Sequence, residues 1–167
     1  MAKTNSTLTV DRLKQILSYD KESGFFTRIS NGLYNAPIGH IAKYVDSRGY
    51  IRVRVDCVQY LAHRLAWFYI NGQWPEKDID HKDRNKINNS WSNLRSVTRT
   101  VNSQNRKNPN RNNSTGYLGV TKTIGGKFQS AISVKGKSLY IGLFKDAEEA
   151  HNAYVEVKRK LHEGCTI

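Results

Sequence analysis

The first hundred residues switch between two spacings of apolar positions. A helical spacing, with a threonine available as N-cap, predicts a short first helix that carries Leu8, Leu13, Ile16 and Leu17 on one face. Strand-like patterns follow at residues 25–29 and 50–55, and residues 57–61 are expected to form the return strand of a hairpin. Residues 62–71 carry an apolar stripe at helical spacing, and Gly72 is expected to end that helix.

The middle of the chain predicts a strand, a loop, a second strand and a helix. Residues 77–81 are expected to form a short strand that ends at the Asp80-His81 pair, and residues 82–92 are rich in Asn, Asp and Ser, which favour turns. Residues 93–97 predict the second strand. Thr98 can cap a helix that continues to about Lys107.

The last third reads as a small sheet backed by one helix. Strands are expected at residues 116–122, 127–134 and 138–144, and Asp146 is expected to cap a helix with apolar residues on one face. The fold class is therefore α+β: a mixed first module with small flanking strands and helices, then a three-stranded antiparallel sheet packed on one helix. We expect a domain over residues 1–107, a linker over 108–114 and a second domain over 115–167.

Charge narrows the class of partner. The chain of 167 residues holds 27 Lys and Arg against 14 Asp and Glu, a formal net charge of +13. Residues 106–145 contain eight Lys or Arg and no acidic residue. This excess of positive charge favours a polyanionic binding partner. A membrane surface is the weaker candidate, because that region contains no basic amphipathic helix. Charge alone does not separate DNA from RNA.

The sequence also predicts the cellular compartment of the protein. No apolar run approaches the length of a membrane span, and residues 1–6 are not followed by the apolar core of a signal peptide. Cys57 and Cys165 lie far apart in the sequence and form no C-x-x-C pair. These features predict a cytoplasmic, non-secreted protein without a structural zinc site or a membrane partner.

The central loop carries the candidate chemistry. Hydrolysis of a phosphodiester needs a base for water and a cation for the developing charge. His81 offers the base, and Asp80 and Asn102 offer oxygen ligands of the kind that Mg²⁺ or Mn²⁺ prefers. Asn93 could fix the loop or the His81 ring by a hydrogen bond. An Asp-His pair is common in proteins, so on its own it is weak evidence for catalysis.

The central residues resemble a known family. The similarity lies in Ala62-His63-Arg64-Leu65-Ala66-Trp67, Trp74-Pro75, Ile79-Asp80-His81, Asn88-Asn89, Asn93-Leu94-Arg95 and Gln104-Asn105. Over residues 8–107 the chain resembles the phage- and intron-encoded homing endonucleases of the HNH family, which are ββα-metal nucleases. The resemblance implies a phage-encoded enzyme acting in the cytoplasm of a bacterial host.

That resemblance also implies a role for each site residue. His81 would be the general base, Asp80 and Asn102 would bind one divalent cation, and Asn93 would position the histidine. The chain has Asn102 where many members have a histidine, a change that favours Mg²⁺ or Mn²⁺ over zinc. His63 is expected to be a hydrogen-bonded structural histidine.

The last third is similar to a second family. The similarity lies in Tyr117-Leu118-Gly119-Val120, Gly126-Lys127-Phe128, the segment from Tyr140 to Phe144 and the segment from Ala147 to Tyr154. Residues 115–163 resemble the plant APETALA or ethylene-response-factor domain, which lays its sheet in the DNA major groove. Leu118, Ala131 and Ser133 stand where those domains tend to carry Arg or Glu, so contacts to phosphates are expected more than strict base readout.

Together these patterns predict a double-stranded DNA endonuclease that acts as a monomer, for which a nick is the simplest product. The expected DNA contacts are Arg64, Arg95, Arg99, Arg106, Lys107, Arg111, Lys122, Lys127, Gln129, Lys135, Lys137 and Tyr140. The alternative is a DNA-binding regulator without catalytic activity. A third class, RNA-binding proteins, lacks support because no aromatic platform for splayed bases is evident.

Overall fold

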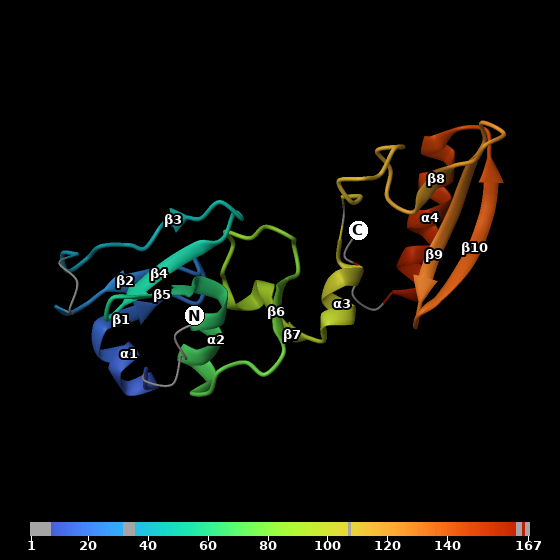
Figure 1. Ribbon diagram of the computed structural model, residues 1–167. Coiled ribbons are helices and arrows are strands. Elements are labelled where there is room, and N and C mark those ends of the chain that lie inside the picture. The colour runs from blue at the N-terminus through green and yellow to red at the C-terminus, as the bar shows by residue number, and fades with distance from the viewer. Residues whose placement is uncertain (1–7, 32–35, 107, 163–164, 166–167) are drawn as a thin grey trace. The chain divides into compact units, whose positions relative to one another are not determined.

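The computed structural model describes residues 8–31, 36–106, 108–162 and 165 (Figure 1). The chain divides into two compact units, Met1–Val97 and Thr98–Ile167, and each is described separately below. The first unit thus ends at Val97, whereas the sequence predicted that the first domain would extend to residue 107. The proposed linker over residues 108–114 stays a prediction, and Asn113 within it donates to the main-chain oxygens of Tyr117 and Val120.

In its described residues, the first unit contains three small antiparallel sheets, two α-helices and one 3₁₀ helix. Its elements are α1 (Val10–Ile16), β1 (Leu17–Tyr19), β2 (Phe26–Arg28), β3 (Tyr44–Val45), β4 (Ile51–Val55), β5 (Val58–Leu61), α2 (Ala62–Asn71), β6 (Asp78–His81), the 3₁₀ helix η1 (Trp91–Asn93) and β7 (Leu94–Val97). Strand β1 pairs with β2, β4 lies between β3 and β5, and β6 pairs with β7.

Local sequence explains most of these elements. The side chain of Thr9 accepts a hydrogen bond from the main-chain nitrogen of Arg12 and so caps α1. Alternate residues of β4 are buried, beginning with Ile51, as expected for a strand with one face in the core. Helix α2 ends where Gly72 adopts a left-handed φ of 72°, a conformation that glycine takes without steric cost.

The core of the first unit lies among α1, α2 and the sheets. Its centre holds Leu13, Ile16, Phe26, Val53, Leu65 and Ala66, each at most 1% exposed. Trp74, just after α2, stacks on Phe68 with ring centroids 4.3 Å apart. This stacking turns the chain back from α2 toward β6, the strand that ends at the Asp80-His81 pair.

The second unit is a three-stranded sheet with a helix on one face. It contains α3 (Arg99–Gln104), β8 (Val120–Lys122), β9 (Phe128–Val134), β10 (Lys137–Phe144) and α4 (Ala147–Leu161). The strand order is β10-β9-β8, all antiparallel, and α4 runs behind the sheet in Figure 1. Gly119 packs on Tyr154 of α4, and a Cβ atom at that position would lie 2.0 Å from the Tyr154 ring.

The structure confirms a mixed α and β chain and the sheet-plus-helix arrangement, and it corrects several boundaries. Leu17, expected on the first helix, begins β1 because the backbone is already extended there. Strand β3 was not expected. Asn93 lies in η1 rather than on the second strand. Helix α3 ends at Gln104, before Lys107, which lies outside the described residues, and β8 begins at Val120 rather than at residue 116.

No helix in the described part of the chain has the length and apolar character needed to cross a membrane.

Candidate active site

The β6–β7 hairpin holds the Asp-His pair at the entrance to the loop. Its register places Asp80 opposite Arg95 and His81 opposite Leu94. Both site residues are buried, with Asp80 8% and His81 4% exposed. Because neighbouring side chains on a strand point to opposite faces, each contacts a different set of neighbours.

The ring of His81 is held by Asn89. The Nε2 atom of His81 lies 3.1 Å from Oδ1 of Asn89. The amide nitrogen of Asn89 donates to the main-chain oxygen of Ile87 at 3.2 Å, which fixes the amide so that its oxygen faces the ring. An amide oxygen only accepts, so Nε2 carries the proton and the basic nitrogen of neutral His81 is Nδ1.

Asn89 is in turn held by the β1–β2 hairpin. The hydroxyl of Tyr19 donates to the main-chain oxygen of Asn89 at 2.7 Å, and the main-chain nitrogen of Trp91 donates to the main-chain oxygen of Lys21 at 2.8 Å. Gly24 has a φ of +74°, and a Cβ atom there would lie 2.2 Å from the main-chain carbon of Asn89. The turn between β1 and β2 therefore supports the loop that carries the partner of His81.

Asn93 organises the loop around Asp83. Its amide nitrogen donates to the Asp83 carboxylate at 2.9 Å and to the main-chain oxygen of Asn88 at 2.8 Å, and its oxygen accepts from the Asp83 main chain. Burial alone would raise the pKa of Asp83, but hydrogen bonds from the Asn85 main chain and from the side chains of Asn88 and Asn93 lower it. The loop thus folds on an ionised carboxylate, with Asn93 as a fixed partner.

Two further rings surround His81. The ring of His63, near the start of α2, meets that of His81 edge-on with centroids 5.0 Å apart, and Tyr50 lies 5.2 Å from His63 and 6.2 Å from His81. Burial, with the nearby His81 and Arg64, lowers the pKa of His63 to about 3. The sequence predicted a hydrogen-bonded His63. For the Nδ1 atom this prediction is wrong, because Nδ1 is buried without a hydrogen-bond partner.

Asp80 forms an ion pair across the hairpin. Arg95 donates to Oδ2 of Asp80 through Nε at 3.0 Å and through Nη2 at 2.8 Å. A buried carboxylate needs such a partner in order to stay charged. The structure therefore gives Arg95, an expected DNA contact, a direct contact with the candidate metal ligand.

The residue types fit a hard cation. A carboxylate and an amide oxygen, completed by water, match the oxygen ligation of Mg²⁺. Asn102 lies on α3 and belongs to the second compact unit, whereas Asp80 belongs to the first, so their joint binding of one ion stays a prediction. The described residues contain no group of three His, Cys, Asp or Glu side chains able to hold a metal.

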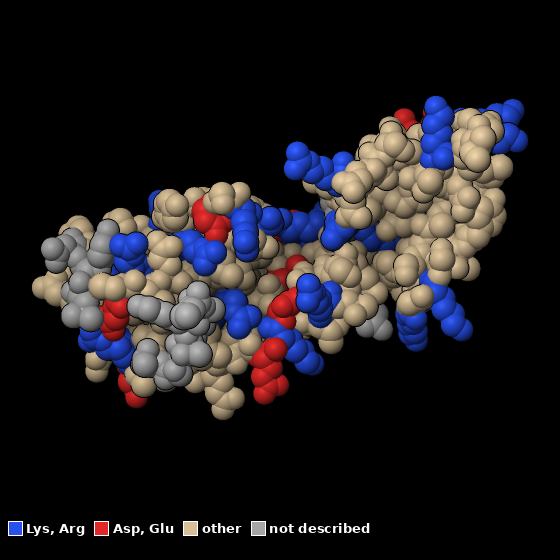
Figure 2. Space-filling model, viewed as in Figure 1, with Lys and Arg blue, Asp and Glu red and all other residues tan. Residues whose placement is uncertain are grey.

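The other expected DNA contacts are scattered along the chain. Arg64 donates to the main-chain oxygen of Pro75 at 3.2 Å and so fastens α2 to the segment before β6. Arg99, Arg106 and Arg111 are exposed. Lysine and arginine side chains, blue in Figure 2, are scattered over the visible faces of both units, and the chain holds 27 of them against 14 acidic residues.

The sheet of the second unit separates its expected contacts between two faces. Gln129 and Tyr140 lie on the face opposite α4, since Tyr140 pairs with Ala131 and Ala131 follows Gln129 by two positions. Lys122 pairs with Phe128, and Lys137 pairs with Val134, on the side that carries the buried residues Ser130 and Ile132. Both lysines are nevertheless exposed, as are Lys127 and Lys135 in the turns.

A family comparison matches the centre of the chain. Residues 60–104 match the family of HNH endonucleases. The matched range includes β6, β7, α3 and the loop between the strands, and supports a nuclease acting on DNA at the level of the family. A search of curated proteins and a search of solved structures found no match to this chain.

Sequence reasoning missed the supports of His81. Asn89 was noted only as part of the HNH resemblance, and Tyr19, Gly24 and Tyr50 were assigned to ordinary turns and strands. Their roles come from contacts between segments far apart in the chain, such as the 70 positions that separate Tyr19 from Asn89. The only local signal was the glycine in the turn before β2.

Proposed function

We propose that this protein is a metal-dependent DNA endonuclease of the homing type, encoded by a phage, and that His81 is its general base. The observation that carries the proposal is the hydrogen bond between His81 Nε2 and Asn89 Oδ1. This hydrogen bond leaves Nδ1 as the basic nitrogen of His81, the residue that follows the Asp80 carboxylate in the sequence. Both residues lie within residues 60–104, which match the HNH family.

The chemistry follows from the side chains. Nδ1 of His81 removes a proton from water, the hydroxide oxygen bonds to phosphorus, and the bond from phosphorus to the leaving oxygen breaks. The leaving oxygen keeps the electron pair of that bond and takes a proton from a second water molecule. Asp80, whose Oδ2 also accepts both hydrogen bonds from Arg95, and Asn102 would hold the cation. When bound, Mg²⁺ or Mn²⁺ would stabilise the negative charge that develops on the phosphate.

Asn89, Asn93 and Tyr19 act on the base indirectly. Asn89 fixes the tautomer and the angle of the His81 ring, Tyr19 holds Asn89, and Asn93 fixes the start of the loop through Asp83. A base whose ring is already oriented loses little entropy when the substrate binds.

The second unit would keep the enzyme on its substrate. Tethering a cutting module to a DNA-binding module raises the local concentration of the cutting site. Lys122, Lys127, Lys135 and Lys137 are exposed around the small sheet and are suited to phosphate contacts.

A DNA-binding regulator without catalysis is the second candidate. The observation in its favour is the ion pair of Asp80 with Arg95 at 2.8 Å, which engages the carboxylate in a structural contact. Supercoiled plasmid incubated with the protein, with and without Mg²⁺ and a chelator, separates the two. Nicked or linear plasmid that depends on the divalent ion supports the endonuclease, and intact plasmid with Mg²⁺ and with Mn²⁺ supports the regulator.

A further inference from the structure

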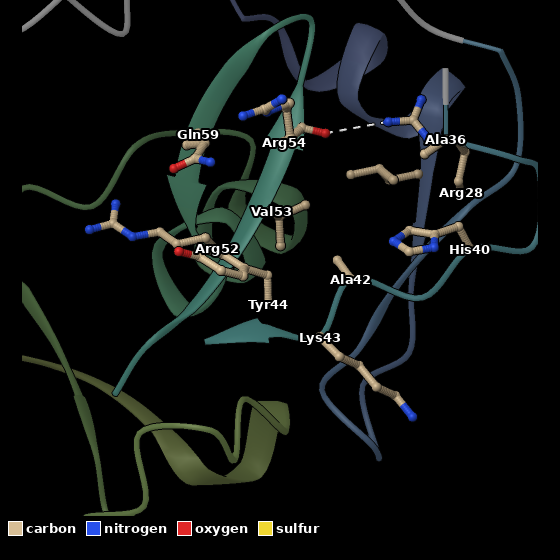
Figure 3. Close-up of a pocket in the computed structure, with 11 residues that line it drawn as sticks. Arg28, Ala36, His40, Ala42, Lys43, Tyr44, Arg52, Val53, Arg54 and Gln59 are labelled. Atoms are coloured by element: carbon tan, nitrogen blue, oxygen red, sulfur yellow. Dashed lines mark hydrogen bonds between the residues drawn. The ribbon is translucent and has the colours of Figure 1, made fainter. Parts of the chain in front are cut away.

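A cavity of about 430 Å³ lies in the first unit beside strand β4 (Figure 3), and neither Asp80 nor His81 lines it. Strands β1 to β5 and the segment before β3 contribute its walls. Its volume falls within the range of small-molecule sites in proteins. Its lining contains none of the residues to which the proposed function above gives a role.

Arg28 is the residue that makes this cavity unusual. It is 4% exposed, yet among the described residues it forms no ion pair. Its Nη2 atom donates to the main-chain oxygen of Arg54 at a long 3.4 Å, drawn as the dashed line in Figure 3. Its Nη1 atom is buried without a hydrogen-bond partner. A buried guanidinium is costly unless an anion accompanies it.

The described residues that line the cavity supply no such anion. None of the residues that line the cavity is Asp or Glu, and residues 29–45 of the sequence contain no acidic residue. Asp46, the next one along the chain, already pairs with Arg52 at 2.7 Å. The charged ends of Arg52 and Lys43 extend away from Arg28 in Figure 3. Arg28 is also more buried than Lys43, Arg52 and Arg54, the other Lys and Arg residues of the lining.

We propose that this cavity binds a nucleoside phosphate, with its phosphate group beside Arg28. Guanidinium is the group best suited to phosphate, and the ring of His40 in the same wall is a second donor. Leu17, Ala42 and Val53 give the cavity apolar walls for the rest of the ligand.

The rim of the cavity fits a base. Tyr44 lines the cavity and is 65% exposed, so its ring is available for stacking. The same chemistry would accept a nucleotide within a nucleic-acid strand or a free nucleotide.

The test is a titration followed by NMR on the full chain without divalent ions, so that cleavage plays no part. Thymidine monophosphate and a short single-stranded oligothymidylate are added separately to protein labelled with ¹⁵N in its arginines. The Nε–Hε resonance of Arg28 should move saturably with both ligands or with one of them. A tighter Kd for the oligothymidylate indicates a strand as the natural source, and an equal or tighter Kd for the monophosphate indicates a free nucleotide.

Two variants make the assignment specific. Arg28→Met keeps the length and apolar surface of the side chain, and it should weaken binding by roughly tenfold or more, since a charged hydrogen-bond partner is lost. Arg48→Met removes an exposed arginine of the same unit and should leave Kd unchanged. An Arg28 resonance that stays still with both ligands, or equal binding by Arg28→Met, overturns the proposal. The wild-type resonance decides the matter even where the variant fails to fold.

Discussion

The Nε2 atom of His81 and the Oδ1 atom of Asn89 lie 3.1 Å apart in a part of the first unit from which solvent is almost excluded. This contact selects one tautomer of the histidine, with the basic lone pair on Nδ1. It also links the candidate base to Tyr19, since the hydroxyl of Tyr19 donates to the main chain of the same asparagine.

Replacing Asn89 should therefore impair cleavage more than DNA binding. Asn89→Ala removes the acceptor that orients His81, and we expect kcat to fall by roughly tenfold to 100-fold, the usual range for loss of an orienting contact. Single-turnover cleavage measures the rate, and a binding titration without divalent ion measures Kd. Asn85→Ala, in the same loop but exposed, is the matched control and should keep most of the activity. Equal rates for the two variants would contradict the orienting role.

His63 should add a pH dependence to the stability of the protein. Burial lowers its pKa to about 3, below the value of about 6.5 for an exposed histidine. In acid the unfolded chain therefore binds a proton that the folded chain does not, so its stabilising contribution is complete above pH 6.5 and is lost as the pH falls. Between pH 7 and pH 5 this loss amounts to about 2 kcal/mol.

The variant His63→Phe keeps a ring in that position and removes the titration. The free energy of unfolding in urea, measured at pH 7 and pH 5, should fall less for His63→Phe than for the wild type. The difference between the two proteins cancels the contribution of other groups. If the free energy of unfolding fell equally in both proteins between pH 7 and pH 5, His63 would be protonated in the folded protein at pH 5.

The ion pair between Arg95 and Asp80 gives a test of the metal site that does not depend on cleavage. Arg95→Met leaves the Asp80 carboxylate buried with one partner fewer, and we expect a loss of roughly 1–3 kcal/mol in the free energy of unfolding. Mg²⁺ should recover part of this loss by binding the carboxylate, and it should stabilise the variant more than the wild type. Thermal unfolding with Mg²⁺ and with chelator measures the effect.

The control for that experiment is the double variant Asp80→Asn with Arg95→Met, which retains the burial but lacks the charge. Mg²⁺ should not stabilise it. If Mg²⁺ stabilises the double variant as much as the single variant, Asp80 is not a ligand of the ion.

Gly24 should be far less tolerant of substitution than another glycine of the same unit. Alanine at residue 24 would place its Cβ atom 2.2 Å from the main chain of Asn89, at a φ of +74°. Gly39→Ala has a similar φ of +85° but open space, and should cost only about 1 kcal/mol. Urea unfolding should show a much larger loss for Gly24→Ala. Equal losses would mean that the turn before β2 does not support the loop.

Residue patterns predicted the parts of this fold that local interactions determine. The alternation around Val53 predicted β4, Gly72 predicted the end of α2, and Asp146 predicted the start of α4, where its side chain accepts from the main chain of Glu148 and Glu149. Each of these follows from the spacing of side chains or from a cap within one turn.

Patterns failed where a contact from elsewhere decides the structure. Leu17 continues the apolar stripe of α1 but pairs with Arg28 in a sheet. The same limit applies to the candidate site. Asp80 and His81 were found from their chemistry, whereas the roles of Asn89 and His63 depend on contacts between distant segments.

The most direct test of the account is single-turnover cleavage of DNA by the wild type and by His81→Ala, with Mg²⁺ and with the binding of each protein to the same DNA measured in parallel. A general base contributes roughly 100-fold or more, so His81→Ala should lose at least that much of the rate while its Kd for DNA stays unchanged. Cleavage by His81→Ala at the rate of the wild type would contradict the assignment of His81 as the base.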